Sequence, residues 1–330
     1  MNYENCFVDI GCQYGTHEII NQFPGNNLVV MIDANPEIEI PIKNNYKHIR
    51  KLLTDKAGDQ YNFKRRVNDG LSGIYEIRDN TYFATLYNSS LFVETYNYFL
   101  TSSTLDIEMN NLKIKPNFIK LDVEGSEESI LKGSLNSLSE CWGMVVELSF
   151  NSIYGDKKSN VHLVGNLQDL DFDFINFYKG LKSIPQHILV NPVNYEESDK
   201  NYGVITSVDA IFLKNFQNLN WDGSFIHKIS HLNFCFRNRL IDLGLKNLES
   251  LISQNDSTPY FLKMLEDSDF SEITWSTLLL IYEHLGNFRF TYRDPRFGFA
   301  DKLLYSLFGF NLSSGMGYWD FHNKIKNKNF

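Results

Sequence analysis

Two glycines and an acidic residue near the start of the chain could form a ligand-binding loop. The apolar run Phe7–Ile10 contains Asp9 and leads into a turn bracketed by Gly11 and Gly15. A glycine lets the backbone approach a ligand closely because it has no Cβ. The turn amides, and the free N–H groups of a helix predicted over 16–23, suit a carboxylate or a phosphate. Since Asp9 suits an ammonium group, the spacing favours a ligand with both an amine and a carboxylate, and S-adenosylmethionine is such a ligand.

The same loop has two competing interpretations. A dinucleotide-binding loop would have the pattern Gly-x-Gly-x-x-Gly, and this chain lacks the third glycine. A nicotinamide-dependent oxidoreductase or epimerase is therefore an alternative that the loop disfavours. A plain strand–turn–helix connection without a ligand also fits these residues, so a second site at the correct distance is needed.

A second acidic residue stands where a ribose would bind. Asp33 follows the apolar run 28–32, roughly twenty residues after the glycine loop, as in one βαβ unit. A carboxylate at the end of that strand accepts hydrogen bonds from two ribose hydroxyls. The alternative is a turn aspartate before Asn35-Pro36. Asp55, after the segment 48–53, would reach an adenine amino group or would be a solvated turn residue.

Two further carboxylates follow the run 118–121. Asp122 ends this predicted strand, Glu124 forms a turn with the next glycine, and Ser126 is the expected N-cap of a helix that ends near Ser139. If the methyl group of S-adenosylmethionine is transferred to a hydroxyl of a second molecule, the acceptor, a neighbouring carboxylate can take the proton of that hydroxyl. Two neighbouring carboxylates also raise the pKa of one of them, which favours a base. We predict that Asp122 or Glu124 is the catalytic base. The alternative is that Asp122 orients the cofactor amine and Glu124 caps the turn.

Three residues are predicted to face the acceptor: Lys120, Glu147 at the end of the run 145–147, and Arg293. Arg293 lies in the stretch 288–297, where aromatic and arginine residues interleave. Such a surface can stack on a carbohydrate or bind an anion, although an aromatic core with a charged edge is the simpler explanation. We expect no metal site, because the two histidines at 227 and 231 have no acidic partner at metal-binding spacing.

These side chains need a sheet whose strand ends meet at one crevice. Alternating apolar runs and helical patterns predict an α/β fold, and in such a fold the carboxyl ends of the parallel strands form that crevice. The segment 172–177 is expected to continue the sheet as a strand, and 203–205 with 208–213 are expected to form the antiparallel pair that closes it. From about residue 216, helical spacing replaces strand-like alternation. We predict a cofactor-binding domain over 1–215 and a helical accessory or substrate region over 216–330.

The composition indicates an ordinary globular protein. Of the 330 residues, 43% are apolar and 22% are charged, and the net charge of −9 argues against nucleic-acid binding. The four cysteines are isolated and are expected to be reduced thiols. No apolar run approaches the ~18 residues that span a bilayer. We therefore expect a cytoplasmic protein.

Several of these motifs together resemble the FkbM family of S-adenosylmethionine-dependent methyltransferases. The Lys-Leu-Asp-Val-Glu-Gly-Ser-Glu block at 120–127 is the most specific of them. The resemblance covers about residues 5–150 and fades toward 215. The other matching segments, in the same order and spacing, are Phe7–Gly15, Asp33–Pro36, Thr104–Asp106, Leu131–Gly133 and Val145–Glu147. This chain has Cys12-Gln13 where the family usually has Ala-Asn, and Asp33-Ala34 where it has Glu-Pro, so its pocket differs slightly.

The resemblance implies a Rossmann-like class I methyltransferase sheet of seven strands with helices on both faces. It also implies methyl transfer from S-adenosylmethionine to an oxygen, often a hydroxyl of a sugar or polyketide. We expect a sugar acceptor, such as a surface-glycan precursor or a nucleotide-linked sugar. A non-catalytic alternative is a module that holds the cofactor and docks a glycosyltransferase. The residues predicted to bind the cofactor are Asp9, Gly11, Gln13, Gly15, Asp33, Asn35 and Asp55.

Overall fold

The chain divides into two compact units. The computed structural model describes residues 3, 5–13, 15–20, 23, 26–38, 43–78, 89–155, 159–178, 183–184, 204–205, 207–219 and 221–253. The larger unit comprises Asn5–Ile20 and Leu28–Asn215, and the smaller one comprises Met1–Glu4, Asn21–Asn27 and Phe216–Phe330.

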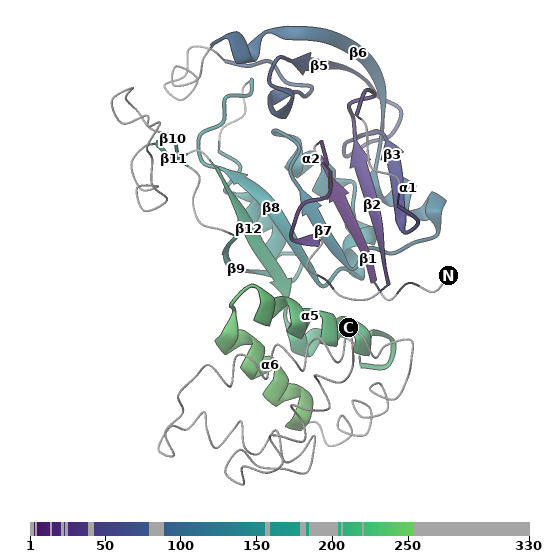
Figure 1. Cartoon of the computed structure of the whole chain (residues 1–330), viewed down its shortest axis with the longest axis vertical. Helices are drawn as coiled ribbons and strands as arrows, with labels where there is room; N and C mark the ends of the chain where they lie inside the picture. The colour runs from purple at the N-terminus through teal and green to yellow at the C-terminus, as the bar shows by residue number, and fades with distance from the viewer. Residues whose placement is uncertain are drawn as a thin grey trace. The chain divides into compact units, whose positions relative to one another are not determined.

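A seven-stranded sheet forms the centre of the larger unit (Figure 1), with the strand order β3-β2-β1-β7-β8-β12-β9. β1, β7 and β8 pair in parallel, as do β2 and β3, whereas β12 is antiparallel to both β8 and β9. The predicted α/β fold with a mainly parallel sheet is confirmed. The strands are β1 (Asn5–Ile10), β2 (Asn27–Asp33), β3 (Tyr46–Arg50), β7 (Phe118–Leu121), β8 (Gly143–Ser149), β9 (Phe172–Tyr178) and β12 (Ser207–Lys214).

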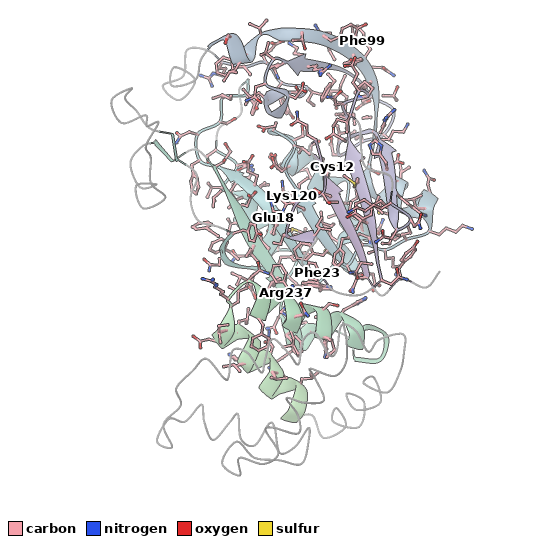
Figure 2. All side chains as sticks on the ribbon, viewed as in Figure 1. Cys12, Glu18, Phe23, Phe99, Lys120 and Arg237 are labelled. Carbon is pink, nitrogen blue, oxygen red and sulfur yellow. The ribbon has the colours of Figure 1, made fainter. Side chains whose placement is uncertain are left out.

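The two central strands are buried along their whole length. Every residue of β1 and of β7 is buried, which explains why both read as nearly continuous apolar runs. Each strand nevertheless carries one charged residue, and the strand register places Asp9 of β1 opposite Lys120 of β7. Figure 2 shows Lys120 within the sheet, away from the outer surface. The sheet thus holds a pair of opposite charges near the strand ends.

The helices of the larger unit are short. They are α1 (Leu105–Leu112), α2 (Glu127–Lys132), α3 (Leu135–Ser139) and α4 (Leu163–Gln168). The prediction of a single helix from Ser126 to about Ser139 is wrong, because α2 ends at Lys132, with Gly133 as its C-cap, and α3 follows as a separate helix. Gly133 packs against a neighbouring loop, and a Cβ there would lie 2.4 Å from the carbonyl oxygen of Thr54. This close approach accompanies the break between the two helices.

Residues 16–19 do not begin the helix that was predicted over 16–23. The described residues 15–20 form bends and a turn, with only Ile20 in a 3₁₀ conformation. The carboxylate of Asp9 accepts a hydrogen bond from the backbone N–H of His17 at 2.6 Å, which ties this turn to the end of β1. Pro24-Gly25, shortly afterwards in the sequence, disfavours a long helix.

A smaller sheet lies beyond the carboxyl ends of β1 and β2 (Figure 1). It has the order β4-β6-β5 and consists of β4 (Leu52–Leu53), β5 (Gln60–Arg66) and β6 (Glu94–Ser103). The short 3₁₀ helices η2 (Asp69–Leu71) and η4 (Ser89–Phe92) belong to the same region. Phe99 of β6 is 81% exposed and lies on the outer side of this sheet (Figure 2). Residues of β4 and β5 in this smaller sheet line the crevice.

The closure of the main sheet differs from the prediction in one respect. β12 does form an antiparallel pair, but its partners are β8 and β9. The segment at 203–205, predicted to pair with it, instead contributes β11 (Val204–Ile205), which pairs with β10 (Ser183–Ile184) in a separate two-stranded sheet. Residues 204–205 and β12 are almost contiguous in sequence, so the chain has no room for a hairpin between them.

From residue 216 on, the described residues are mainly helical. They include η6 (Phe216–Asn218), α5 (Trp221–Arg237) and α6 (Ile241–Ser253). Phe23 stacks on Phe234 of α5 with ring centroids 5.7 Å apart. Residues 254–330, which include Arg293, lie outside the described residues. No helix within the described ranges is long and apolar enough to cross a membrane.

Candidate active site

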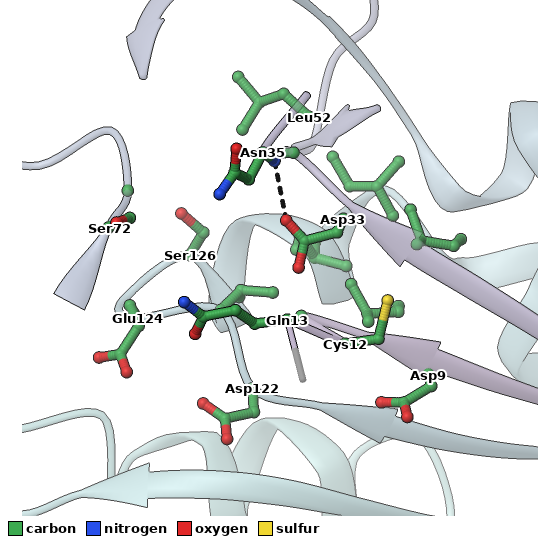
Figure 3. A pocket seen from close by; sticks show the side chains of 18 of the residues that line it. Asp9, Cys12, Gln13, Asp33, Asn35, Leu52, Ser72, Asp122, Glu124 and Ser126 are labelled. Atoms are coloured by element: carbon green, nitrogen blue, oxygen red, sulfur yellow. Dashed lines mark hydrogen bonds between the residues drawn. The ribbon is translucent and has the colours of Figure 1, made fainter. Parts of the chain in front are cut away.

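A cavity of about 390 Å³, the large cavity, lies at the carboxyl ends of β1, β2 and β7 (Figure 3). Nine of the residues predicted from the sequence line it together, although they come from three separate segments of the chain. They are Asp9, Gly11, Gln13, Gly15, Asp33, Asn35, Lys120, Asp122 and Glu124. The topology brings them together because parallel neighbouring strands end at the same edge of a sheet.

The two glycines of the loop have different structural roles. Both have left-handed backbone conformations, with φ of +85° at Gly11 and +104° at Gly15. A Cβ on Gly11 would lie 1.7 Å from the backbone oxygen of Asp122, so Gly11 allows the first loop to pack against the loop after β7. A Cβ on Gly15 would meet nothing within 4 Å. The loop thus presents open space beside Gly15.

Asp9 and Asp33 are unusual carboxylates. Burial raises the pKa of each from 3.8 to about 6. Asp9 is 1% exposed and accepts the hydrogen bond from His17, while Asp33 accepts one from the backbone N–H of Asn35 at 2.8 Å (Figure 3). Carboxylates held at this depth bind cations or hydroxyl donors strongly, because little water competes. Asp9 suits an ammonium group, and Asp33 suits a pair of neighbouring hydroxyls.

Lys120 forms an ion pair with a neighbouring carboxylate. Its ammonium group lies 2.6 Å from the Asp122 carboxylate, and its side chain is 4% exposed. Burial alone would lower the pKa of Lys120, but the charges of Asp122 and Asp209 outweigh it and raise the pKa. Lys120 is therefore a buried cation, and Asp122 is its direct counter-ion.

Glu124 occupies a strained position in the loop after β7. Its φ is +56°, which is uncommon for a residue with a side chain. The hydroxyl of Tyr154 donates a hydrogen bond to its carboxylate at 2.7 Å. Burial, followed by the charges of Glu147 and Asp122, raises the pKa of Glu124 well above its usual value. A carboxylate of this kind is a stronger base than one in water.

The loop that carries Glu124 is tied down by the next helix. The Glu127 carboxylate accepts hydrogen bonds from the backbone N–H groups of Val123 at 3.1 Å and Gly125 at 3.2 Å. Ser126 does occupy the predicted N-cap position of α2, but its side chain makes no capping hydrogen bond. The Glu127 side chain reaches back to the loop instead. This arrangement holds Glu124 in its unfavourable backbone conformation.

The remaining predicted residues lie elsewhere. Glu147 is outside the large cavity, and it accepts a hydrogen bond from Ser207 at 2.9 Å. Asp55 is exposed, does not line the large cavity, and accepts a hydrogen bond from the hydroxyl of Ser129 at 2.9 Å. Arg293 lies outside the described residues.

Some lining residues were not predicted. The smaller sheet and its loops supply an apolar wall from Leu52, Leu53 and Phe63, and a polar one from Asp69 and Ser72. The turn signal Asn-Asp-Gly at 68–70 was recognisable in the sequence, but nothing there indicates that it faces the glycine loop. Tyr154 was missed for the same reason, because it is 30 residues from its partner Glu124.

Comparison with known proteins identifies the family. Residues 9–174, half of the 330-residue chain, match the model of the methyltransferase FkbM domain. Neither the curated proteins nor the solved structures contain a match to this chain. The matched stretch runs from Asp9 through the Asp122–Glu124 loop, and thus includes the predicted residues of the large cavity. This protein therefore belongs to the FkbM family of methyltransferases.

Proposed function

We propose that this protein is an S-adenosylmethionine-dependent O-methyltransferase that acts on a hydroxyl of a sugar or glycan precursor. We further propose that its fold is a Rossmann-like class I methyltransferase sheet with helices on both faces. One observation carries most of the proposal. The buried carboxylate of Asp9 and the half-buried carboxylate of Asp33 lie near the carboxyl ends of two adjacent strands, and both line a cavity that Glu124 also lines. This arrangement suits a ligand with an amine and a ribose beside an acceptor hydroxyl.

The residues present fit the cofactor. The cavity volume lies within the ~300–1,000 Å³ typical of small-molecule sites. The side-chain amide nitrogen of Gln13 is buried and has no hydrogen-bond partner among the described residues, so a ligand oxygen would satisfy it. Asp9 and the glycine loop would hold the amino-acid part and Asp33 the ribose. The apolar wall of Leu52, Leu53 and Phe63 would pack against the adenine.

Glu124 is the better candidate for the base. Bound S-adenosylmethionine would supply an activated methyl group, so the protein's main tasks are to align the acceptor oxygen and to receive its proton. Glu124 has a raised pKa and would take that proton as the oxygen gains the methyl group. Asp122 instead accepts a hydrogen bond from the Lys120 ammonium at 2.6 Å, so one of its carboxylate oxygens is already engaged. We therefore assign Asp122 to positioning and Glu124 to proton removal.

Calorimetric titration tests the proposed cofactor. The protein should bind S-adenosylhomocysteine and give no signal with NAD. The reverse result would favour an oxidoreductase. A protein that binds S-adenosylhomocysteine but transfers no labelled methyl group to any component of an extract from its source cells would favour a cofactor-holding module.

Cofactor affinity should depend on pH near 6. Below that pH, protonation of Asp9 and Asp33 removes the charge that binds the amine and the acceptors that bind the ribose. Because the ligand favours the ionised carboxylates, affinity for S-adenosylhomocysteine should fall as the pH is lowered from 7.5 to 5. Titrations across this range measure the effect. The Asp33→Asn variant should bind more weakly at pH 7.5 and show a shallower pH dependence, and an affinity independent of pH in the unmodified protein would contradict the assignment.

Tyr154→Phe should shift the pH profile of methyl transfer. The Tyr154 hydroxyl stabilises the ionised form of Glu124, so its removal should raise the pKa of Glu124 further. Since the rate rises with pH as Glu124 loses its proton, the ascending limb of kcat against pH should move to higher pH. Turnover near neutrality should fall several-fold and recover in alkaline buffer. An unchanged profile would show that Tyr154 does not act through Glu124.

A further inference from the structure

Glu124 also borders a second cavity, of about 360 Å³. Among the described residues it is the only one that lines both cavities. In Figure 3 the carboxylates of Asp122 and Glu124 point the same way, away from Asp33. Glu147, near the end of β8, contributes to the second cavity, and its carboxylate oxygen lies within 4.8 Å of those of Asp122 and Glu124. The proposed base is thus accessible from two separate spaces.

The wall of the second cavity is preformed. The side-chain nitrogen of Asn160 donates hydrogen bonds to the backbone oxygen of Glu147 at 3.1 Å and to the Glu127 carboxylate at 3.3 Å. Its side-chain oxygen accepts one from the backbone N–H of Ser149 at 2.5 Å. Asn160 therefore ties the end of β8 to the loop that carries Glu124. A cavity with a fixed wall needs little rearrangement to bind a ligand.

The lining of this cavity indicates the chemistry of its ligand. Ser149, Ser152 and Ser159 line it, and a serine hydroxyl can both donate and accept a hydrogen bond. Four of its described lining residues are glutamates, and none is Lys or Arg. Hydroxyl groups of a ligand would find partners throughout such a wall. A phosphate or carboxylate would meet negative charge instead.

We propose that the second cavity binds the acceptor, and that the methylated sugar residue is polyhydroxylated and carries no carboxylate or phosphate ester of its own. The proposal rests on the proposed methyltransferase function and adds the place and charge class of its acceptor. In this arrangement the cofactor occupies the large cavity, the acceptor occupies the second one, and the reacting hydroxyl meets Glu124 between them. The proton passes from the acceptor oxygen to Glu124, and the oxygen takes the methyl group from the donor sulfur.

Filling the second cavity should block transfer without affecting the cofactor. Ser152→Phe and Ser159→Phe should each lower labelled methyl transfer to an extract of the source cells at least 100-fold, while affinity for S-adenosylhomocysteine stays within twofold. Ser139→Phe, an exposed site outside both cavities, is the matched control and should transfer at the normal rate. If the filled variants bind S-adenosylhomocysteine and transfer normally, the acceptor does not bind there. If one of the two variants loses S-adenosylhomocysteine binding, methyl transfer by the other variant tests the proposal.

The charge of the product tests the acceptor class. The labelled product is hydrolysed in acid to single residues, which leaves uronic acids and non-anomeric phosphate esters charged, and is passed over an anion exchanger at pH 7. Label that passes through supports the proposal, and retained label overturns it. If the unmodified protein fails to bind S-adenosylhomocysteine at all, the methyltransferase proposal itself fails, and that result is distinct from either outcome above.

Discussion

Glu124→Gln should reduce kcat for methyl transfer by about 10²–10⁴-fold, the usual contribution of a general base. The amide retains the shape of the side chain, and its oxygen can still accept the hydrogen bond from Tyr154. It cannot take a proton from the acceptor. Affinity for S-adenosylhomocysteine should therefore stay within about twofold, since the expected loss concerns the proton and not the cofactor. Labelled transfer and calorimetry measure the two quantities separately.

Two other substitutions make this result specific. Glu140→Gln changes an exposed glutamate that pairs with Lys115, and should leave both quantities unchanged. Asp122→Asn should lower stability, because the buried ammonium of Lys120 loses its nearest counter-ion. If Glu124→Gln keeps full turnover and a stably folded Asp122→Asn protein loses it, Asp122 removes the proton and Glu124 does not.

Gly11→Ala should destabilise the protein far more than Gly15→Ala. The new Cβ at position 11 would lie 1.7 Å from the backbone oxygen of Asp122, and this backbone is tied to β1 by the hydrogen bond from the Asp122 N–H to the Ile10 carbonyl, so it cannot move aside cheaply. We expect a loss of at least about 4 kcal/mol in the free energy of unfolding, within the range of the most severe substitutions. Position 15 has the same kind of left-handed backbone but open space around it. Gly15→Ala should therefore cost only about 1–2 kcal/mol.

Urea unfolding followed by titration with S-adenosylhomocysteine distinguishes these positions. The Gly15→Ala protein should remain folded, but its affinity should fall at least tenfold, because the methyl group occupies space beside the proposed ligand. Equal stability of the two variants would show that the packing of the first loop against the loop after β7 is looser than the geometry implies. Unchanged affinity in Gly15→Ala would place the ligand away from that residue.

Local residue types were enough to predict the central strands, the residues at the crevice and the family. The central strands were predictable because a strand buried on both faces must be an almost continuous apolar run, as in Val29–Ile32 and Phe118–Leu121. The rule that parallel strands end at one edge then placed Asp9, Asp33 and Asp122 at the same crevice, and the structure has them there. The block at 120–127 was specific enough to indicate the family, which the family model confirms.

Contacts between distant segments decided the rest. The helix break at Gly133 involves the carbonyl of Thr54, and the position of Glu124 depends on Tyr154 and Glu127. The pairing of Lys120 with Asp122 is a consequence of burial, since an unpaired ammonium within a sheet would be too costly. Residue patterns report which side chains are apolar and how they repeat, but they do not report which loops meet. The separation into two cavities that share Glu124 is therefore a property of the tertiary structure alone.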